Sequence, residues 1–129
     1  MFELAKEYFR SWISKREPWF FENSKVPVWL SKVAPIEINA VNIVCFVFSR
    51  GKMLKTTQRH ETIHYHQQIE MAFLFHWVAY AYYFLKGLVV YRNGRKAYSE
   101  NPFEREANDN QKKHKYLYRR PLWNWVNYR

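Results

Sequence analysis

Hydrophobic side chains recur at helical spacing near the start of the chain, among Lys, Arg and Glu. This pattern predicts a short amphipathic helix over residues 2–16, which Pro18 ends. The apolar positions are Phe2, Ala5, Phe9, Trp12 and Ile13. From residue 19 to 35, aromatic residues alternate irregularly with Pro27 and polar residues, which predicts a loop carrying a short packed element.

The next segment favours extended structure. Residues 36–48 are rich in Ile, Val and Phe, and the sequence Ser-Arg-Gly-Lys at 49–52 follows as a turn. Because residues 41–48 are nearly all apolar, we expect this strand to be covered on both faces.

A long helical pattern follows the turn. Thr56 or Thr57 offers an N-cap, and the pattern continues to about Tyr91, where Asn93-Gly94 stops it. A straight helix of that length would extend for about 50 Å, more than the diameter of a domain of this size, at 1.5 Å per residue. We therefore expect a break or bend near Lys86-Gly87.

One more helix is predicted near the end of the chain. Asn101 is a good cap and Pro102 suits the first helical position, so the helix begins there and continues into residues 112–115. A basic, aromatic tail over residues 116–129 follows it. Together the elements predict a mostly helical α+β fold, with a strand before one helix and a second helix after it.

Length and composition restrict the classes of protein. The chain has 129 residues, of which 48% are hydrophobic, so we expect one folded domain over 1–129, with an N-terminal helix and loop (1–35) and a core (36–125). A single cysteine, Cys45, excludes a disulfide framework and a thiolate metal cage. The first residues carry two acids and show no secretory signal, so we expect a cytoplasmic protein.

The motif with the most specific chemistry is His60-Glu61-Thr62-Ile63-His64, of the form H-E-x-x-H. Two histidines four positions apart lie about 40° from each other around a helix, so both imidazoles can reach one ion. The intervening Glu61 then stands beside a water molecule that the metal activates. The motif indicates hydrolysis by zinc; the alternative is a polar helix face whose histidines are solvated.

A catalytic zinc site normally takes three protein ligands, so a third must be found. The extended pattern H-E-x-x-H-x-x-G-x-x-H is excluded, because the chain has Gln67 and Glu70 where that pattern requires Gly and His. The other common solution takes a glutamate from a second helix, and Glu104 is the candidate. Glu106 points roughly 200° away from Glu104 on the same helix and is the rival ligand.

Glu104 shares one helix face with Ala107, Asn108 and Gln111. The small Ala107 would let this helix approach the H-E-x-x-H helix closely, and Asn108 could hydrogen-bond a ligand histidine. Asn101 and Glu104 also fit a capping box, in which the glutamate caps its own helix. We favour the ligand interpretation, because the H-E-x-x-H motif requires a third ligand.

The chain resembles a known family in these segments. His60 to His64 followed by Glu104-Arg105-Glu106-Ala107-Asn108 resembles the gluzincin branch of zinc metallopeptidases, whose signature is H-E-x-x-H with a glutamate helix of the form E-x-x-A-D. Residues 46–48, 59–64, 67–68 and 103–107, with the basic-aromatic end, are similar to small uncharacterised bacterial H-E-x-x-H proteins. The similarity covers about residues 36–125.

The resemblance implies a minimal zincin-like domain and a zinc-dependent metallopeptidase that hydrolyses peptide bonds. It implies zinc ligands at His60, His64 and Glu104, with Glu61 as general base. Asn108 replaces the Asp that is usual in gluzincins. Tyr98 and His114 are the candidates for the side chain that steadies the oxyanion. The substrate would be a peptide or protein, held by backbone pairing with the edge of the strand at 41–48.

The helical segment over residues 71–91 is apolar all round apart from His76, Lys86 and Gly87. Such a helix is buried in a core or lies in a membrane. We favour core burial, with insertion at a membrane surface and a dimer surface as alternatives. We expect His66 and His76 to be surface or hydrogen-bonded core histidines, and Cys45 to be a buried inert thiol.

The charge balance suggests a second kind of function. Lys and Arg exceed Asp and Glu by 21 to 11, a formal net charge of +10 that attracts any polyanion. The rival hypothesis is therefore a non-enzymatic, basic protein that binds an anionic membrane surface or nucleic acid and holds a structural metal. Nucleic acid is the less favoured partner, because a basic-aromatic tail is more often a solvated face that packs its aromatics inward.

Overall fold

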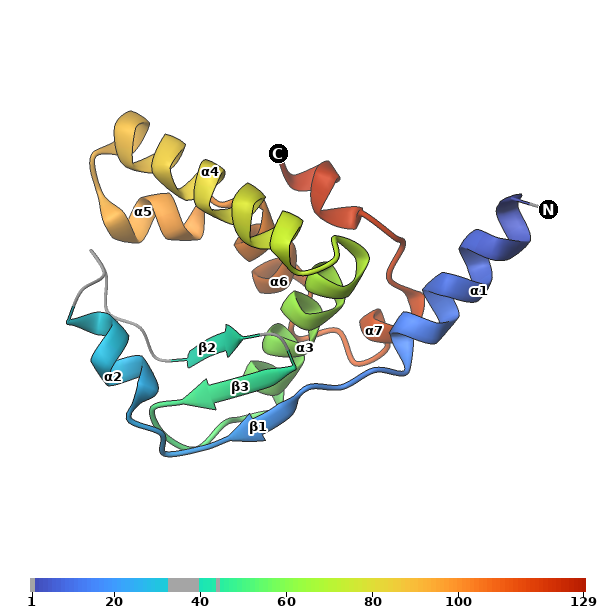
Figure 1. The fold of residues 1–129 in the computed structure, drawn as a ribbon, viewed down its shortest axis with the longest axis horizontal. Helices are drawn as coiled ribbons and strands as arrows, with labels where there is room; N and C mark the ends of the chain where they lie inside the picture. Colours follow the sequence, from blue (N-terminus) through green and yellow to red (C-terminus); the bar gives the residue numbers. More distant parts are fainter. Residues whose placement is uncertain (1, 33–39, 44) are drawn as a thin grey trace.

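The structure is a computed structural model that describes residues 2–32, 40–43 and 45–129. It confirms a mostly helical α+β fold with a small sheet before the H-E-x-x-H helix (Figure 1). Its elements are α1 (Phe2–Ser14), β1 (Trp19–Phe21), α2 (Val26–Ser31), β2 (Ala40–Ile43), β3 (Phe46–Ser49), α3 (Lys55–Glu70), α4 (Leu74–Tyr91), α5 (Gly94–Ser99), α6 (Pro102–Asn110), α7 (Tyr116–Arg119) and the 3-10 helix η1 (Asn124–Tyr128).

Helix α1 is confirmed close to its expected position. It ends at Ser14 and buries Ile13, while Phe2 and most of its other apolar side chains remain exposed. The helix contacts α3 and α7. Arg10 pairs with Glu7 and donates a hydrogen bond of 2.8 Å to the Tyr118 carbonyl, which ties the N-terminal helix to the C-terminal segment.

The apolar segment expected to form one strand forms two. β3 is the central strand, parallel to β1 on one side and antiparallel to β2 on the other. The apolar run is long enough to fold back on itself, so the backbone groups of its two halves satisfy one another. The expected beginning of the strand at residues 36–39, together with residue 44, lies outside the described residues.

The sheet is covered on one face rather than on both. Along β3, Val47 and Ser49 are buried, whereas Phe46 is exposed. Phe46 instead packs against Trp19 and Phe21 of the neighbouring β1, with ring centroids 6.0 and 5.9 Å apart. The alternation of a strand explains the difference, because neighbouring residues point to opposite faces.

The long helix breaks earlier than expected. α3 and α4 are separated by residues 71–73, and the helix direction bends by 115° there. At this bend Ala72 and Phe73 adopt positive φ angles of 53° and 57°. Neither threonine is the cap, because α3 begins at Lys55 with Leu54 as its N-cap residue and no side-chain cap. The expected break at Gly87 is wrong as well.

Gly87 lies inside α4, at a point where the contact with α5 requires a small residue. A Cβ atom at this position would lie 2.9 Å from the Cα and the Cβ of Ala97 in α5, so the glycine allows the two helices to approach closely. Its role is packing rather than interruption of the helix.

The hydrophobic core is centred on Phe103, at the start of α6. Phe103 is fully buried and clusters with Met71 and Trp125, and Tyr80 and Tyr83 of α4 pack against this cluster. The C-terminal tail therefore folds back onto the core and packs Trp125 inward. α6 begins at Pro102, as expected, but ends at Asn110 before the lysine run.

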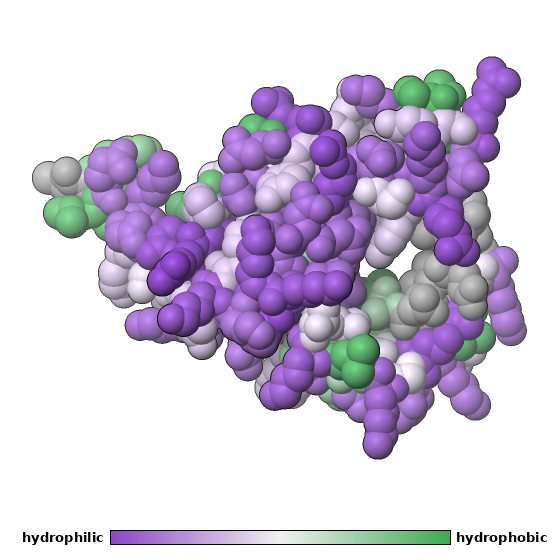
Figure 2. Space-filling view, turned by 180° about the vertical axis from the view of Figure 1, so that it is seen from behind, coloured by the Kyte–Doolittle hydropathy of each residue, from purple (hydrophilic) through white to green (hydrophobic). Residues whose placement is uncertain are grey.

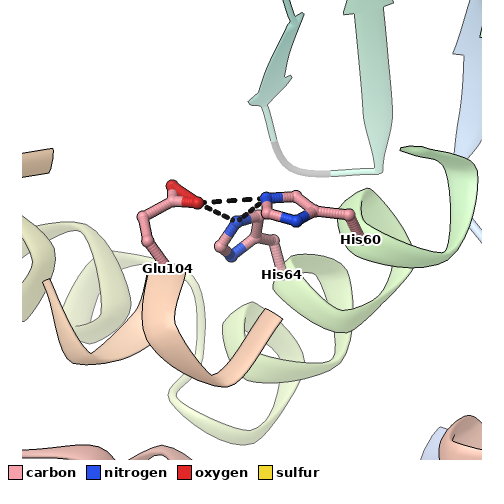
Figure 3. Close-up of side chains that lie close together, drawn as sticks. All are labelled: His60, His64 and Glu104. Atoms are coloured by element: carbon pink, nitrogen blue, oxygen red, sulfur yellow. Dashed lines mark hydrogen bonds and ion pairs between the residues drawn. The ribbon is translucent and has the colours of Figure 1, made fainter. Parts of the chain in front are cut away.

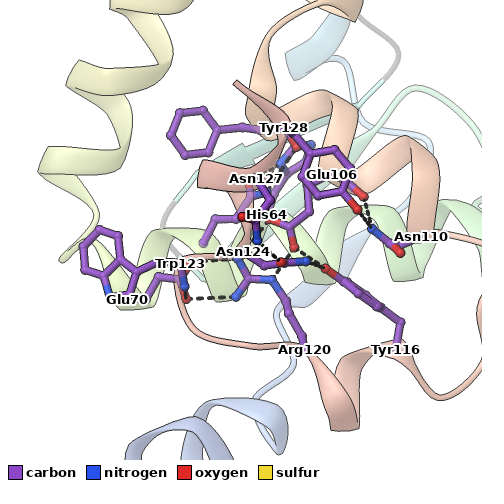
Figure 4. A network of polar contacts seen from close by, with 12 residues as sticks. His64, Glu70, Glu106, Asn110, Tyr116, Arg120, Trp123, Asn124, Asn127 and Tyr128 are labelled. Carbon is purple, nitrogen blue, oxygen red and sulfur yellow. Dashed lines mark hydrogen bonds and ion pairs between the residues drawn. The ribbon is translucent and has the colours of Figure 1, made fainter. Parts of the chain in front are cut away.

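A buried ion-pair network also fixes the tail (Figure 4). Arg120 is buried and donates to Glu70 at the end of α3 at 2.7 and 2.9 Å. The same guanidinium contacts Glu106 of α6 at 2.5 and 3.0 Å, and Tyr116 donates to Glu106 at 2.6 Å. One arginine therefore joins α3, α6 and the C-terminal segment.

We expected helix α4 to be buried in the core, but most of it is not. Among its residues only His76 and Gly87 are buried, and many of its apolar side chains are exposed. Of the helices in the described residues, none is by itself long and apolar enough to cross a membrane, although α3 and α4 pass that test as a bent pair.

Candidate metal centre

Three side chains from two helices meet at one point (Figure 3). Oε1 of Glu104 lies 3.0 Å from Nε2 of His60 and 2.9 Å from Nε2 of His64. The two Nε2 atoms lie 3.1 Å from each other. All three residues are buried. The structure thus brings together the three residues that the sequence proposes as ligands.

Local geometry accounts for this convergence. His60 and His64 are one turn apart on α3, so their rings point in the same direction. α6 contacts α3 and brings Glu104 to them, and Ala107, on the same face of α6 as Glu104, is fully buried. The small side chain of Ala107 suits such an approach.

Glu104 does not cap its own helix. The side chain of Asn101 accepts a hydrogen bond from the Phe103 N–H at 3.1 Å, as an N-cap does. The N–H of Asn101 itself donates to the Tyr98 carbonyl at 3.2 Å. The Glu104 carboxyl instead contacts the two histidines and Tyr80, which is the arrangement expected of a ligand.

The ring nitrogens that point away from Glu104 contact two glutamines. Nδ1 of His60 lies 2.9 Å from Oε1 of Gln111, and Nδ1 of His64 lies 2.9 Å from Oε1 of Gln67. If the amide oxygen of each glutamine accepts a hydrogen bond from Nδ1–H, the neutral ring carries no proton on Nε2, which is then free for a metal ion. Asn108, expected to make such a contact, is exposed; Gln111 lies one turn further along the same face and takes its place.

A tyrosine that sequence reasoning did not single out completes the site. The Tyr80 hydroxyl of α4 donates to Oε2 of Glu104 at 2.8 Å. Tyr80 lies in the apolar helix α4, and no sequence pattern relates its position to the H-E-x-x-H motif. Burial raises the pKa of Tyr80 well above its ordinary value, and the Glu104 carboxylate adds to this effect, so the phenol stays protonated and can donate.

The two candidates for the oxyanion-stabilising residue occupy different surroundings. Burial raises the pKa of Tyr98, and the nearby carboxyls of Glu104 and Glu61 raise it further, so Tyr98 lies beside the candidate site. His114 is exposed, and its Nδ1 lies 3.2 Å from the Arg59 guanidinium. Of the two, Tyr98 is therefore the one that the structure associates with Glu104 and Glu61.

Charges are strongly coupled within the site. Burial disfavours the charged form of His64, but the Glu104 carboxylate outweighs it and raises the pKa of His64 to about 9. Burial would raise the pKa of Glu104, but the imidazoles, His64 foremost, hold it below its ordinary range. The buried Glu104 carboxylate is thus neutralised by positive charge on the two imidazoles. A bound cation can also neutralise it.

Glu61 and Glu106 have distinct environments. Glu61 is buried, and burial raises the pKa of its carboxyl, while interactions with His64 and His60 lower it. Asn42 of β2 donates to the Glu61 carbonyl at 2.8 Å, which ties the sheet to this turn of α3. Glu106, the rival ligand, belongs to the Arg120 network, and its Oε1 accepts from Gln67 at 2.9 Å.

The other two core histidines lie outside the triad. Nε2 of His66 lies 2.8 Å from the Arg16 carbonyl, as expected of a hydrogen-bonded core histidine. His76 is buried, but neither of its ring nitrogens has a hydrogen-bond partner among the described residues. Its ring packs edge-on against Phe103, with centroids 4.6 Å apart.

The three side chains form a group that can hold a metal ion. One ligand atom from each lies within 4.8 Å of the other two. Ligand atoms around a tetrahedral zinc ion, with bonds of about 2.0–2.1 Å, lie about 3.3 Å apart, so these atoms need to separate by only a few tenths of an ångström. Two imidazoles and a carboxylate are donors that zinc accepts. No protein family, curated protein or solved structure matches the chain.

Proposed function

We propose that the protein is a zinc-dependent hydrolase that cleaves peptide bonds. The observation that carries this proposal is the position of Oε1 of Glu104, within 3.0 Å of both Nε2 atoms of an H-E-x-x-H pair. His60, His64 and Glu104 would hold the ion, which leaves a fourth position for water or substrate. When bound, zinc supplies Lewis-acid chemistry: it polarises a carbonyl and lowers the pKa of water toward about 7.

The residues around the ligands have separate tasks. Glu61 accepts the proton of the attacking water and returns it to the leaving amine, a general base and then a general acid. Gln111 and Gln67 hold the imidazoles through Nδ1, so that each Nε2 would be available to the ion. The protonated Tyr98 phenol, beside Glu61 and Glu104, is the group we assign to hydrogen-bond the developing oxyanion.

An extended substrate has a strand available for pairing. β2 lies at the edge of the sheet as far as the structure describes it, because β3 occupies the centre. Asn42 of β2 bonds the Glu61 carbonyl, so this strand is anchored beside the turn that carries the general base. Backbone pairing with β2 would align a peptide with little regard to its sequence.

Metal content and cleavage test the proposal separately. Protein purified without added metal should contain one zinc per chain, and Glu104→Gln should lose it. Glu100→Gln, an exposed glutamate from the adjoining segment, is the matched control and should keep it. A wild-type protein without affinity for zinc would refute the metal site.

Glu61→Gln then distinguishes catalysis from mere metal binding. This variant should retain zinc but cleave fluorescence-quenched peptides at least about a hundredfold more slowly than wild type. Chelation should abolish wild-type cleavage, and added zinc should restore it. If the wild type binds zinc stoichiometrically and cleaves no peptide, the rival hypothesis of a non-enzymatic protein with a structural metal is correct.

A further inference from the structure

Helix α4 presents a continuous hydrophobic surface to solvent. Six large side chains on one side of this helix are each 59–77% exposed. We call them the α4 apolar face: Leu74, Phe75, Val78, Tyr82, Leu85 and Val89. They recur mostly at three- and four-residue spacing along α4, so they form one stripe from Leu74 to Val89, about 22 Å long at 1.5 Å per residue.

Helix α1 also exposes apolar side chains, with Phe2, Leu4 and Tyr8 76–80% exposed, but there they lie among the acids Glu3 and Glu7. The side of the molecule seen in Figure 2 is mostly hydrophilic, and its hydrophobic groups are small and separate. In Figure 1, α4 runs along the rim of the molecule and passes in front of α6. A long exposed apolar stripe on a folded protein marks a binding surface.

The opposite side of α4 is already occupied. Tyr80 and Tyr83 pack on the Phe103 cluster, and Gly87 lies against Ala97 of α5. The helix cannot leave these contacts without exposing the core. Helix α4 can therefore contact a partner with its exposed side, but a partner cannot surround the helix.

Charge around the face is entirely positive in the sequence. Residues 71–99 contain no Asp or Glu. Lys86 borders the face, and Arg92, Arg95 and Lys96 follow at the C-terminal end of α4, all of them exposed. The chain as a whole carries a formal net charge of +10.

A pocket adjoins the C-terminal half of α4. Its volume is about 570 Å³, and Lys86 and Val90 of α4 contribute to its lining. Its charged lining residues are Lys86, Arg105, Arg129 and Glu100, three cations against one acid. The pocket can therefore bind an anionic group at the edge of the apolar face.

We propose that the α4 apolar face docks on an anionic membrane surface, with α4 parallel to the plane of the lipid headgroups. The exposed side chains enter the boundary between headgroups and acyl chains, and Lys86, Arg92 and Arg95 contact lipid phosphates. A second copy of this chain fits less well, because it would bring the same cations against an equally charged protein. Nucleic acid would satisfy the cations but leave the apolar stripe in water.

Vesicle binding tests the proposal, and it is independent of metal binding and cleavage. The wild type should co-sediment with vesicles of phosphatidylcholine containing about 30 mole per cent phosphatidylglycerol, and much less with phosphatidylcholine alone. Salt at about 1 M, which shortens the Debye length to about 3 Å, should reduce binding to the anionic vesicles.

Charged substitutions locate the binding surface. Val78→Glu/Leu85→Glu should weaken binding to anionic vesicles at least tenfold, because two apolar side chains that would enter the membrane boundary become charged. Glutamate has a higher helix propensity than valine and both positions are exposed, so the helix should persist, which circular dichroism checks. Leu4→Glu/Tyr8→Glu on α1, also exposed, makes the same change in net charge and should bind as the wild type does.

The cations are tested in a separate variant. Arg92→Gln/Arg95→Gln should weaken binding to anionic vesicles about tenfold while leaving binding to phosphatidylcholine unchanged. The proposal fails if the α4 double variant binds as the wild type does, or if the α1 variant loses as much binding. It also fails if light scattering shows a dimer that Val78→Glu/Leu85→Glu dissociates, or if the protein binds single-stranded DNA and no vesicle.

Discussion

The Tyr80 hydroxyl donates to Oε2 of Glu104 at 2.8 Å, while Oε1 of the same carboxyl faces the two histidines. A residue from the apolar helix α4 thus fixes the orientation of the proposed carboxylate ligand. Because Tyr80 also packs against the Phe103 cluster, the hydrophobic core positions the phenol that holds the ligand. Core packing and metal affinity should therefore be coupled in this protein.

Tyr80→Phe should weaken zinc binding about 10-fold to 100-fold, because it removes the hydrogen bond that orients the Glu104 carboxylate. The ring remains, so packing against Phe103 should be preserved. Competition with a chromogenic chelator measures the affinity. Tyr82→Phe, on the exposed side of the same helix, is the control and should bind zinc as the wild type does. Equal affinities for the two variants would show that Tyr80 does not orient the ligand.

Arg120 joins three parts of the fold, so its replacement should have a large cost. Arg120→Met leaves Glu70 and Glu106 buried beside one another without a cation, and it should reduce the free energy of unfolding by about 3–5 kcal/mol. Urea denaturation measures this loss. Arg119→Met, at an exposed neighbouring position, should change the stability by less than about 0.5 kcal/mol. If Arg120→Met were as stable as the wild type, the tail would not be held by this network.

The candidate ligands could be predicted from the sequence because their spacing follows helix geometry. The period of the helix fixes the relation between His60 and His64, and the face shared by Glu104 and Ala107 selects Glu104 over Glu106. The contacts of Gln67, Gln111 and Tyr80 depend on how α3, α4 and α6 cross, which no local pattern encodes. Asn108 is on the expected side of α6, but the crossing brings Gln111 rather than Asn108 to the histidine.

The same distinction applies to the fold. The start of α6 was predictable because an Asn cap followed by Pro is a local signal. The break between α3 and α4 has no such signal, since Ala72 and Phe73 are not residues that usually adopt positive φ. Conversely, Gly87 resembles a helix breaker but serves the contact with α5. Tertiary packing decides both cases.

Gly87→Ala tests the packing role of that glycine. Alanine favours an isolated helix by about 1 kcal/mol, but here its Cβ would meet the Ala97 backbone at 2.9 Å and force α4 and α5 apart. We expect a net loss of about 1–2 kcal/mol in the free energy of unfolding, measured with urea. Gly51→Ala has nothing within 4 Å of the new Cβ and provides the control, with little expected change. A more stable Gly87→Ala protein would mean that α5 can move away from α4 at little cost in free energy.

His76 should make the protein sensitive to acid. Burial lowers the pKa of His76 to about 3, from 6.5 in the unfolded chain. Between these two values the unfolded chain binds a proton that the folded protein does not, so the free energy of unfolding falls as the pH is lowered through this range. At pH 5 the contribution is about 2 kcal/mol, since one pKa unit corresponds to about 1.4 kcal/mol.

His76→Phe removes this titration and retains a ring against Phe103. Urea denaturation of both proteins at pH 8 and pH 5 isolates the effect, because the other titrating residues are the same in each. The stability of the variant relative to the wild type should rise by about 2 kcal/mol between pH 8 and pH 5. The variant also removes two buried ring nitrogens that lack partners among the described residues, so it should not be less stable at pH 8. A pH-independent difference would instead mean that His76 is protonated at similar pH in the folded and unfolded states.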